Sequence, residues 1–254
     1  MPLPARTRVW AGYLEQFHRD RPGITTDTLG TARHSGIDPY QWAVEALPAG
    51  VRIVDVACGD GPVFHRIRPA AWVGVDLSGG ELRRARGGGA GPLVRADAGR
   101  LPLADASAPA VVCSMALMIV SPLEPVLAEI RRVLTADGTA VALLPGGRPL
   151  TGRDLLRYGE LMWRLRRTHL AYPNDWRLAR LRAAAGRAGL AVVDDRRRRF
   201  ALPLGSGADA GRFVESLYLP GVAPERIRAA DAAARRWVPG HIGVPLRRIT
   251  FRPA

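Results

Sequence analysis

Short apolar runs alternate with amphipathic stretches over residues 51–145. Five runs carry this pattern, in the order VRIVDVA, AWVGVDL, PLVRAD, APAVVCSM and GTAVALLP. Parallel strands buried on both faces are apolar throughout, whereas the helices that cover them show apolar residues at helical spacing. The alternation therefore predicts an α/β fold with right-handed crossovers and a Rossmann-like, doubly wound sheet.

The segment before this core has a different pattern. Residues 8–18 and 38–47 place aromatic and aliphatic side chains at helical spacing, and Asp38 followed by Pro39 predicts the start of the second helix. The residues between them are rich in turn formers and predict a loop or a short lid. We therefore assign residues 1–50 to an N-terminal helical cap.

Residues 51–254 make up the main predicted domain. After the fifth apolar run, helical patterns predict insertions at about 151–188 and 208–238. Two later runs, residues 190–204 and 243–253, predict two further strands, which brings the expected sheet to seven strands.

The net charge of +14 invites a nucleic-acid partner, but the composition suggests another cause. All 37 basic residues are arginines, and asparagine occurs only at Asn174. Loss of lysine and asparagine with a surplus of Ala, Gly, Pro and Arg is typical of a GC-rich genome. We favour that origin, with no nucleic-acid partner. We also interpret Arg196–Arg199 as an exposed sheet edge rather than an anion site.

The location of the protein is predicted from what its sequence lacks. No apolar stretch reaches the roughly 18 to 20 residues of a membrane span, and the opening residues MPLPARTRVW lack the apolar core of an export signal. Cys58 and Cys113 give neither a disulfide framework nor zinc-like spacing. We expect a cytoplasmic protein without a membrane segment and without a metal.

Acidic residues stand at the ends of three successive predicted strands. Asp55 lies in the first, Asp76 follows 21 positions later, and Asp97 comes another 21 positions on. The carboxyl ends of parallel strands share one edge, where open sheets bind their ligands, and a carboxylate there accepts ribose hydroxyls. The chain lacks both a G-x-G-x-x-G pattern and a P-loop lysine, so the expected ligand is an adenosine without phosphates.

With the motifs VDVACGDG, VGVDLS, RADAGRLPLAD and RRVLTADGTAVALLP in this order, the chain resembles the class I S-adenosylmethionine (SAM) dependent methyltransferases, specifically the bacterial, small-molecule, type 11-like group. The resemblance covers about residues 51–145. It implies a mostly parallel seven-stranded sheet with an antiparallel last strand, SAM as cofactor and S-adenosylhomocysteine as product.

The resemblance also implies which residues contact the cofactor. The backbone of the glycine turn, residues 57–61, would hold the methionine part of SAM. Asp76 would accept the ribose hydroxyls, and Asp97 would accept the adenine amino group. The full set of implied cofactor residues is Asp55, Ala57, Cys58, Gly59, Gly61, Asp76, Leu77, Asp97, Ala98, Met115 and Ala116.

Three departures from the family pattern affect these expectations. Ala57 stands where the family has its first glycine, a change between small residues that we expect to cost little. SAPAVV, residues 107–112, lacks the usual aromatic-Asp pair. Met118 lies in a segment where many relatives carry histidine, so a familiar candidate base is missing and an apolar pocket wall is expected.

Residues beyond the cofactor site are assigned by position. His34 and His169 are candidate bases, because histidine is the usual proton acceptor near neutral pH. Aromatic residues of the cap could cover the positively charged sulfur, while an insertion could form the acceptor pocket; both groups are equally interpretable as core. These lid and pocket candidates are Tyr13, Tyr40, Met118, Tyr158, Met162 and Trp163.

Three functions remain open. The leading hypothesis is methyl transfer to oxygen, nitrogen or carbon of a small, apolar or aromatic metabolite, in natural-product metabolism, by a monomer or homodimer. The second is an RNA or protein methyltransferase that uses its arginine-rich surface. The third is a SAM-binding homologue that no longer transfers methyl groups, acting as a scaffold or a cyclase.

Overall fold

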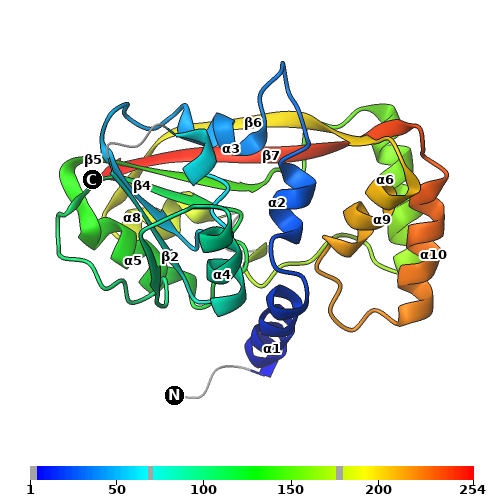
Figure 1. The fold of residues 1–254 in the computed structure, drawn as a ribbon, viewed down its shortest axis with the longest axis horizontal. Coiled ribbons are helices and arrows are strands. Elements are labelled where there is room, and N and C mark those ends of the chain that lie inside the picture. The colour runs from blue at the N-terminus through cyan, green and yellow to red at the C-terminus, as the bar shows by residue number, and fades with distance from the viewer. Residues whose placement is uncertain (1–4, 68–70, 176–179) are drawn as a thin grey trace.

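A seven-stranded sheet organises the molecule (Figure 1). The computed structural model describes residues 5–67, 71–175 and 180–254. The strand order is β3-β2-β1-β4-β5-β7-β6, which confirms the predicted doubly wound sheet. The strands are β1 (Arg52–Val56), β2 (Ala71–Asp76), β3 (Leu93–Arg95), β4 (Ala108–Ser114), β5 (Leu134–Pro145), β6 (Leu190–Leu204) and β7 (Gly240–Pro253).

The first five strands are parallel, and β7 pairs antiparallel with both β5 and β6, as expected for the last strand. In the parallel part, Asp55 of β1 is opposite Gly74 of β2. The carboxyl ends of β1, β2 and β4 therefore meet at one edge of the sheet. β6 is an outer strand, so Arg196–Arg199 lie on a sheet edge, where Arg196 and Arg197 are exposed but Arg198 and Arg199 are half-buried.

Helices cover both faces of the sheet and one end of it. They are α1 (Ala5–Asp20), α2 (Ile24–Leu29), α3 (Pro39–Val44), the 3₁₀ helix η1 (Phe64–Arg66), α4 (Gly79–Gly87), α5 (Leu123–Val133), α6 (Gly152–Leu165), α8 (Leu181–Arg187), α9 (Gly207–Glu215) and α10 (Pro224–Arg235). Asp38 caps α3 as predicted, because its carboxylate accepts from the N–H groups of Tyr40 and Gln41. None of the described helices is long and apolar enough to cross a membrane.

The core follows this layering. α5 and α8 pack on one face of the sheet, and their apolar side chains join those of β1, β4 and β5 in a single cluster. β6 and β7 extend beyond the parallel strands, and α6, α9 and α10 gather at that far end (Figure 1). α1 and α2 lie between the two parts. α6, α9 and α10 of the insertions thus gather near α1 and α2 of the cap, whereas α3 of the cap and α8 of the first insertion pack against the sheet.

One element differs from the sequence predictions. α2 forms inside the expected loop or lid, where Leu29 is buried. After β1 the chain forms only the short η1 before β2. α5 ends at Val133 because β5 begins at Leu134, which pairs with Ala108 of β4.

Candidate functional site

A cavity of about 1000 Å³ opens at the carboxyl ends of β1, β2 and β4, beneath α1. We call it the acid-lined cavity. Its acidic residues are Glu15, Asp55, Asp60, Asp76, Glu81 and Asp97. Of the residues implied to contact the cofactor, all line this cavity except Gly61. Four of the described arginines line the same cavity, namely Arg19, Arg83, Arg95 and Arg100. The preference for a positively charged ligand therefore comes from the buried acid Asp55.

The glycine turn after β1 has a left-handed backbone at three positions. The φ angles are 55° at Ala57, 55° at Gly59 and 81° at Gly61. A side chain at such an angle costs about 1–2 kcal/mol, so Ala57 is not the nearly neutral replacement for glycine that we expected. A Cβ on Gly61 would approach Ala90 to 3.1 Å. Gly61 therefore packs the turn against the loop after α4 rather than facing the cavity.

Asp76 fixes the shape of this turn. Its Oδ2 accepts from the N–H of Gly59 at 2.8 Å, and its Oδ1 accepts from the N–H of Ser78 at 2.8 Å. Burial raises the pKa of Asp76, and these two N–H groups oppose the rise. Each carboxylate oxygen has a second lone pair, so the side chain can still accept from a pair of ligand hydroxyls.

Asp55 is the most buried acid of the site, with 1% of its surface exposed. Neither of its carboxylate oxygens makes a hydrogen bond of ordinary geometry with the described residues, although the Trp72 side chain is near enough to lower its pKa in part. Burial, together with the nearby charge of Asp76, raises the pKa of Asp55 well above its usual range. A buried acid without an ordinary hydrogen bond is costly, and a cationic group in the cavity would relieve that cost.

The adenine end of the expected ligand meets a different surface. Leu77 is 63% exposed at the wall of the acid-lined cavity, which is unusual for a large apolar side chain after a buried strand. Asp97 accepts from the N–H of Gly99 at 2.8 Å, and Ala98 and Ala116 lie on the same wall. Together with the buried Asp55, this exposed leucine fits SAM, which carries a flat aromatic base at one end and cationic groups at the other.

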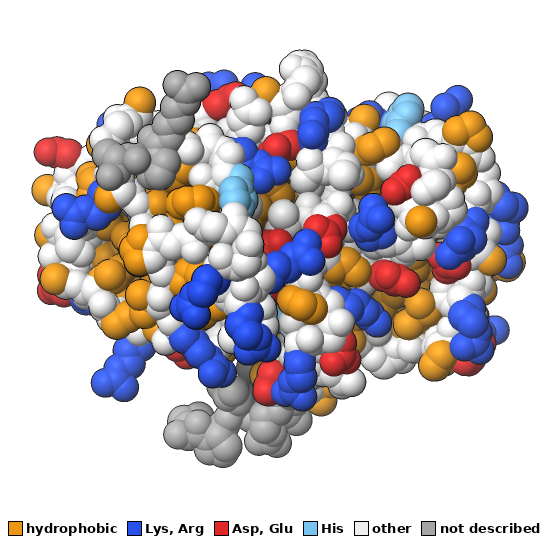
Figure 2. All heavy atoms as spheres, viewed as in Figure 1, with side chains coloured by type: hydrophobic (Ala, Val, Ile, Leu, Met, Phe, Trp, Pro, Cys, Tyr) orange, Lys and Arg blue, Asp and Glu red, His pale blue; other side chains and the backbone are white. Residues whose placement is uncertain are grey.

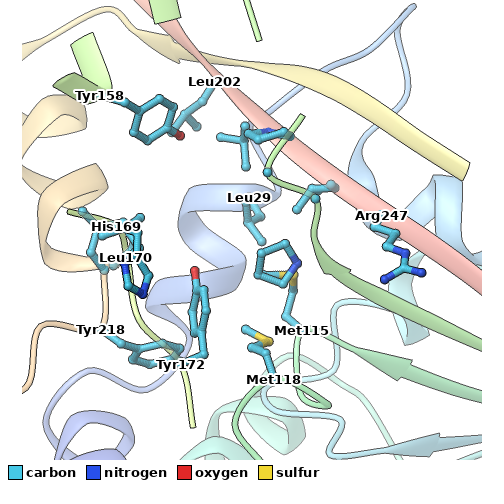
Figure 3. A pocket seen from close by; sticks show the side chains of 18 of the residues that line it. Leu29, Met115, Met118, Tyr158, His169, Leu170, Tyr172, Leu202, Tyr218 and Arg247 are labelled. Atoms are coloured by element: carbon cyan, nitrogen blue, oxygen red, sulfur yellow. The ribbon is translucent and has the colours of Figure 1, made fainter. Parts of the chain in front are cut away.

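A second cavity of about 630 Å³ lies beyond Met115, between the sheet and the cap (Figure 3). We call it the apolar cavity. Met118, Tyr158, Met162 and His169, all named from the sequence, line it. Figure 3 shows Tyr158 at one end, and Tyr172 and Tyr218 at the other end with Met115 and Met118. Leu29, Leu170, Leu202, Phe213, Leu217 and Leu246 complete most of the apolar wall.

The two cavities meet at three residues. Thr25 of α2, Met115 after β4 and Tyr218 after α9 line both of them, and we call this place the junction. Met115 also has a left-handed backbone, with φ of 56°, and its N–H donates to the carbonyl of Leu143 at 2.8 Å. Strained backbone of this kind gathers at functional sites.

Other residues named from the sequence lie elsewhere. Trp163 is 68% exposed and lines neither cavity, because α6 turns Tyr158 and Met162 inward and the next position outward. His34 also lies outside both, with Nδ1 at 3.0 Å from the carbonyl oxygen of Arg199. Tyr13 packs within the cap, where its hydroxyl accepts from the N–H of Leu219 at 2.7 Å. Tyr40 lines the acid-lined cavity and is buried.

Sequence reasoning did not single out a chain of polar side chains beside the junction. Nδ1 of His18 lies 2.9 Å from Oε1 of Glu81, and Nε2 of His18 lies 3.2 Å from the hydroxyl of Tyr218. These residues come from α1, α4 and the segment after α9. No local pattern could reveal them, since the partners are 63 and 200 positions from His18. The described residues contain no cluster of three or more metal-ligating side chains.

Comparison with known proteins agrees with this geometry. Residues 54–142 match the family model described as "Methyltransferase domain". No protein of curated function matches the sequence.

Many solved structures share the fold, and three of them indicate its range. A SAM-dependent methyltransferase from Thermotoga maritima, described as a possible histamine N-methyltransferase, has a TM-score of 0.54 and 15% identity, over 96% of this chain and 99% of that one. A putative methyltransferase in complex with the Haloferax volcanii Trm112 activator has a TM-score of 0.50 and 16% identity, over 100% of both chains. The [4+2]-cyclase SpnF has a TM-score of 0.51 and 19% identity, over 85% of this chain and 80% of that one. At these identities the three structures share only the fold with this chain.

Proposed function

Because the chain carries a class I SAM-dependent methyltransferase domain, we propose that it transfers the methyl group of SAM to a small, largely apolar acceptor held in the apolar cavity. The observation that carries this proposal is the junction. Thr25, Met115 and Tyr218 line both cavities, so a cofactor in one and an acceptor in the other would meet there. A role in natural-product metabolism and a cytoplasmic location are parts of the same proposal.

The acid-lined cavity supplies the groups that would hold SAM. Asp76 would accept the ribose hydroxyls, Leu77 would pack on adenine, and Asp97 would accept the adenine amino group. Asp55 would face the cationic methionine end, beside the turn from Ala57 to Gly59. When bound, SAM supplies a methyl group on a positively charged sulfur, which is already a good leaving group.

The apolar cavity limits the acceptor. A volume of about 630 Å³ suits a small molecule rather than a macromolecular segment. Its walls are mostly leucine, methionine, phenylalanine and tyrosine side chains, which favour an apolar or aromatic skeleton. Asp175, Arg197 and Arg247 also line the cavity, so the acceptor can carry a polar group as well. In such a cavity, alignment of the reacting atoms and exclusion of water provide much of the acceleration.

The arginine surplus does not favour a nucleic-acid partner. Figure 2 shows arginines dispersed over one face, with acidic and apolar side chains between them. Several are committed to ion pairs within the chain, as in Arg84 with Asp27 and Asp60, Arg132 with Asp105 and Glu129, and Arg247 with Asp195. These pairs support the interpretation that the arginines in them are not free to bind a nucleic acid, and Arg247 lines the apolar cavity instead of the outer surface.

The test is to incubate the full chain with methyl-labelled SAM and an extract of its host, and then to separate RNA, protein and organic-soluble fractions. We expect the label in the organic-soluble fraction. Label in RNA or protein would assign the macromolecular function instead. SAM binding without transfer to any fraction would leave a scaffold or a cyclase, the activity carried by one structure of similar fold.

A bulky side chain in the apolar cavity should separate acceptor binding from cofactor binding. Met162→Trp fills space at the wall of the apolar cavity, so we expect at least a tenfold loss of transfer with SAM affinity within twofold of wild type. Leu156→Trp is the matched control, because Leu156 is on the same helix and 78% exposed. Equal transfer by the two variants would show that the acceptor does not occupy this cavity.

A further inference from the structure

A hydrogen-bonded chain of three side chains ends at the junction. Glu81 Oε1 is 2.9 Å from Nδ1 of His18, and Nε2 of His18 is 3.2 Å from the Tyr218 hydroxyl. Tyr218 lines both cavities, whereas His18 and Glu81 line only the acid-lined cavity. The order of groups is carboxylate, imidazole and phenol, with the phenol facing the place where the two cavities meet.

The surrounding structure holds this chain in one geometry. The second oxygen of Glu81 accepts from the N–H of Gly23 at 2.9 Å, which ties the start of α2 to α4. The Tyr218 ring packs edge-on against Phe17 at 4.7 Å and against Tyr172 at 6.3 Å. Glu81 is 5% and Tyr218 is 8% exposed. Because packing already fixes the rotamers of these side chains, they need little further ordering to act together.

The position of Tyr218 at the junction distinguishes it from the other candidate bases. Of the three described residues at the junction, Thr25 and Met115 have no ionisable side chain, so Tyr218 alone can exchange a proton readily. His169, which we predicted as a base, belongs to the apolar cavity only, and 68% of its side chain is exposed. The other predicted base, His34, lines neither cavity.

We infer that Tyr218, His18 and Glu81 form a proton relay that removes the proton of an acceptor hydroxyl during methyl transfer. This inference rests on the proposed function and narrows its acceptor to an alcohol, enol or phenol on an apolar skeleton. Tyr218 is the catalytic residue that touches the acceptor. His18 receives the proton, and Glu81 is a positioning residue that holds the imidazole with Nδ1 protonated and Nε2 free to accept.

The transfer step balances without a further reactant. The acceptor oxygen forms its bond to the methyl carbon as the carbon–sulfur bond breaks, and the electron pair of that bond stays on sulfur. The acceptor proton passes to the oxygen of Tyr218, while the proton of Tyr218 passes to Nε2 of His18. The resulting imidazolium is stabilised by Glu81 through its Nδ1–H, and solvent takes the extra proton afterwards.

The state of the phenol supports a relay. Burial raises the pKa of Tyr218 well above its usual value. Tyr218 therefore stays protonated in the resting protein, and it passes a proton on rather than serving as a standing phenolate. Burial also raises the pKa of Glu81, and the hydrogen bond from His18 opposes that rise. The attraction between Glu81 and His18 is therefore strongest when the imidazole is charged.

The first test replaces side chains of the relay in the full chain. Tyr218→Phe keeps the ring but removes the relay oxygen, so we expect kcat for label transfer to the organic-soluble fraction to fall about 100-fold or more, with SAM affinity within twofold. His18→Gln should also lower kcat, and its SAM affinity is measured separately because His18 lines the acid-lined cavity. His65→Gln is the control for the histidine variant, since His65 is exposed and lines neither cavity.

The second test reads the proton positions directly. Nitrogen NMR of isotope-labelled histidine, with S-adenosylhomocysteine bound, should show His18 as the neutral form protonated at Nδ1. Glu81→Gln should reduce the preference for that form. A merely structural contact would not require this tautomer, so the measurement does not depend on knowing the acceptor.

The outcomes are distinct. The predicted tautomer together with loss of kcat in Tyr218→Phe supports the relay. An Nε2-protonated His18, or wild-type kcat in Tyr218→Phe while the wild type transfers label, overturns the relay and leaves the methyl-transfer function standing. No transfer by the wild type to any fraction overturns the proposed function, and the role of the relay in catalysis falls with it.

Discussion

Asp55 lies in an environment unlike ordinary solution. It is buried and lies near the charge of Asp76, and these two effects outweigh the opposing influence of the Trp72 side chain. Its neutral form is therefore favoured. In the fold without ligand, its contribution to stability is therefore fully present below the usual Asp pKa, and it is lost as the pH rises through the raised pKa.

The same burial predicts a pH-dependent affinity for SAM. A cation near Asp55 favours the carboxylate, so binding should tighten as the pH rises through the raised pKa of Asp55, and proton release should accompany binding. Calorimetric titration with SAM between about pH 5 and pH 8 would measure this slope. The variant Asp55→Asn should bind more weakly and lose most of the slope. An equal slope in both proteins would assign the pH dependence to another group.

At the scale of elements, one carboxylate joins α6 to the two outer strands. Asp154 accepts from Nε of Arg199 on β6 at 2.6 Å, and also from the N–H of Gly243 on β7 at 2.7 Å. It closes a capping box with Thr151 at the start of α6 as well. Asp154 is 1% exposed, and its partners, Arg199 first among them, lower its pKa against the effect of burial.

Loss of Asp154 should therefore destabilise the helical end of the molecule. Asp154→Ala leaves Arg199 without its partner, and we expect the free energy of unfolding to fall by about 3–5 kcal/mol. In the wild type, the contribution of this carboxylate is present above the usual Asp pKa and is lost as the pH falls toward its lowered value. Denaturant unfolding measures both effects. Asp137→Ala, at an exposed position of β5, is the control, and equal stability of the two variants would contradict this account.

The elements divide into those that local sequence determines and those that it does not. The parallel strands were predictable because a short continuous apolar run is typical of a strand buried on both faces. Since the carboxyl ends of parallel strands lie at one edge of the sheet, Asp55, Asp76 and Asp97 were expected to lie close together. α2 was not predictable, because its residues are turn formers in isolation. It forms where the N–H of Gly23 meets Glu81 and where Leu29 is buried.

At the scale of the whole molecule, the site is assembled from distant segments. The acid-lined cavity follows from strand topology, which the sequence shows. The junction needs α2, the end of β4 and the segment after α9 to come together, as they do beside α1. No periodicity indicates such contacts, which explains why His34 and Trp163 were predicted and His18, Glu81 and Tyr218 were not.

The dissociation constant of SAM tests the central claim, that the acid-lined cavity is the cofactor site, most directly. We would measure it by calorimetry for the wild type, Asp76→Ala and the surface control Asp137→Ala. We predict that Asp76→Ala weakens binding by about 1.5–3 kcal/mol, roughly 10- to 150-fold, through loss of charge-assisted hydrogen bonds, while the control binds as the wild type does. Unchanged affinity in Asp76→Ala would contradict the account.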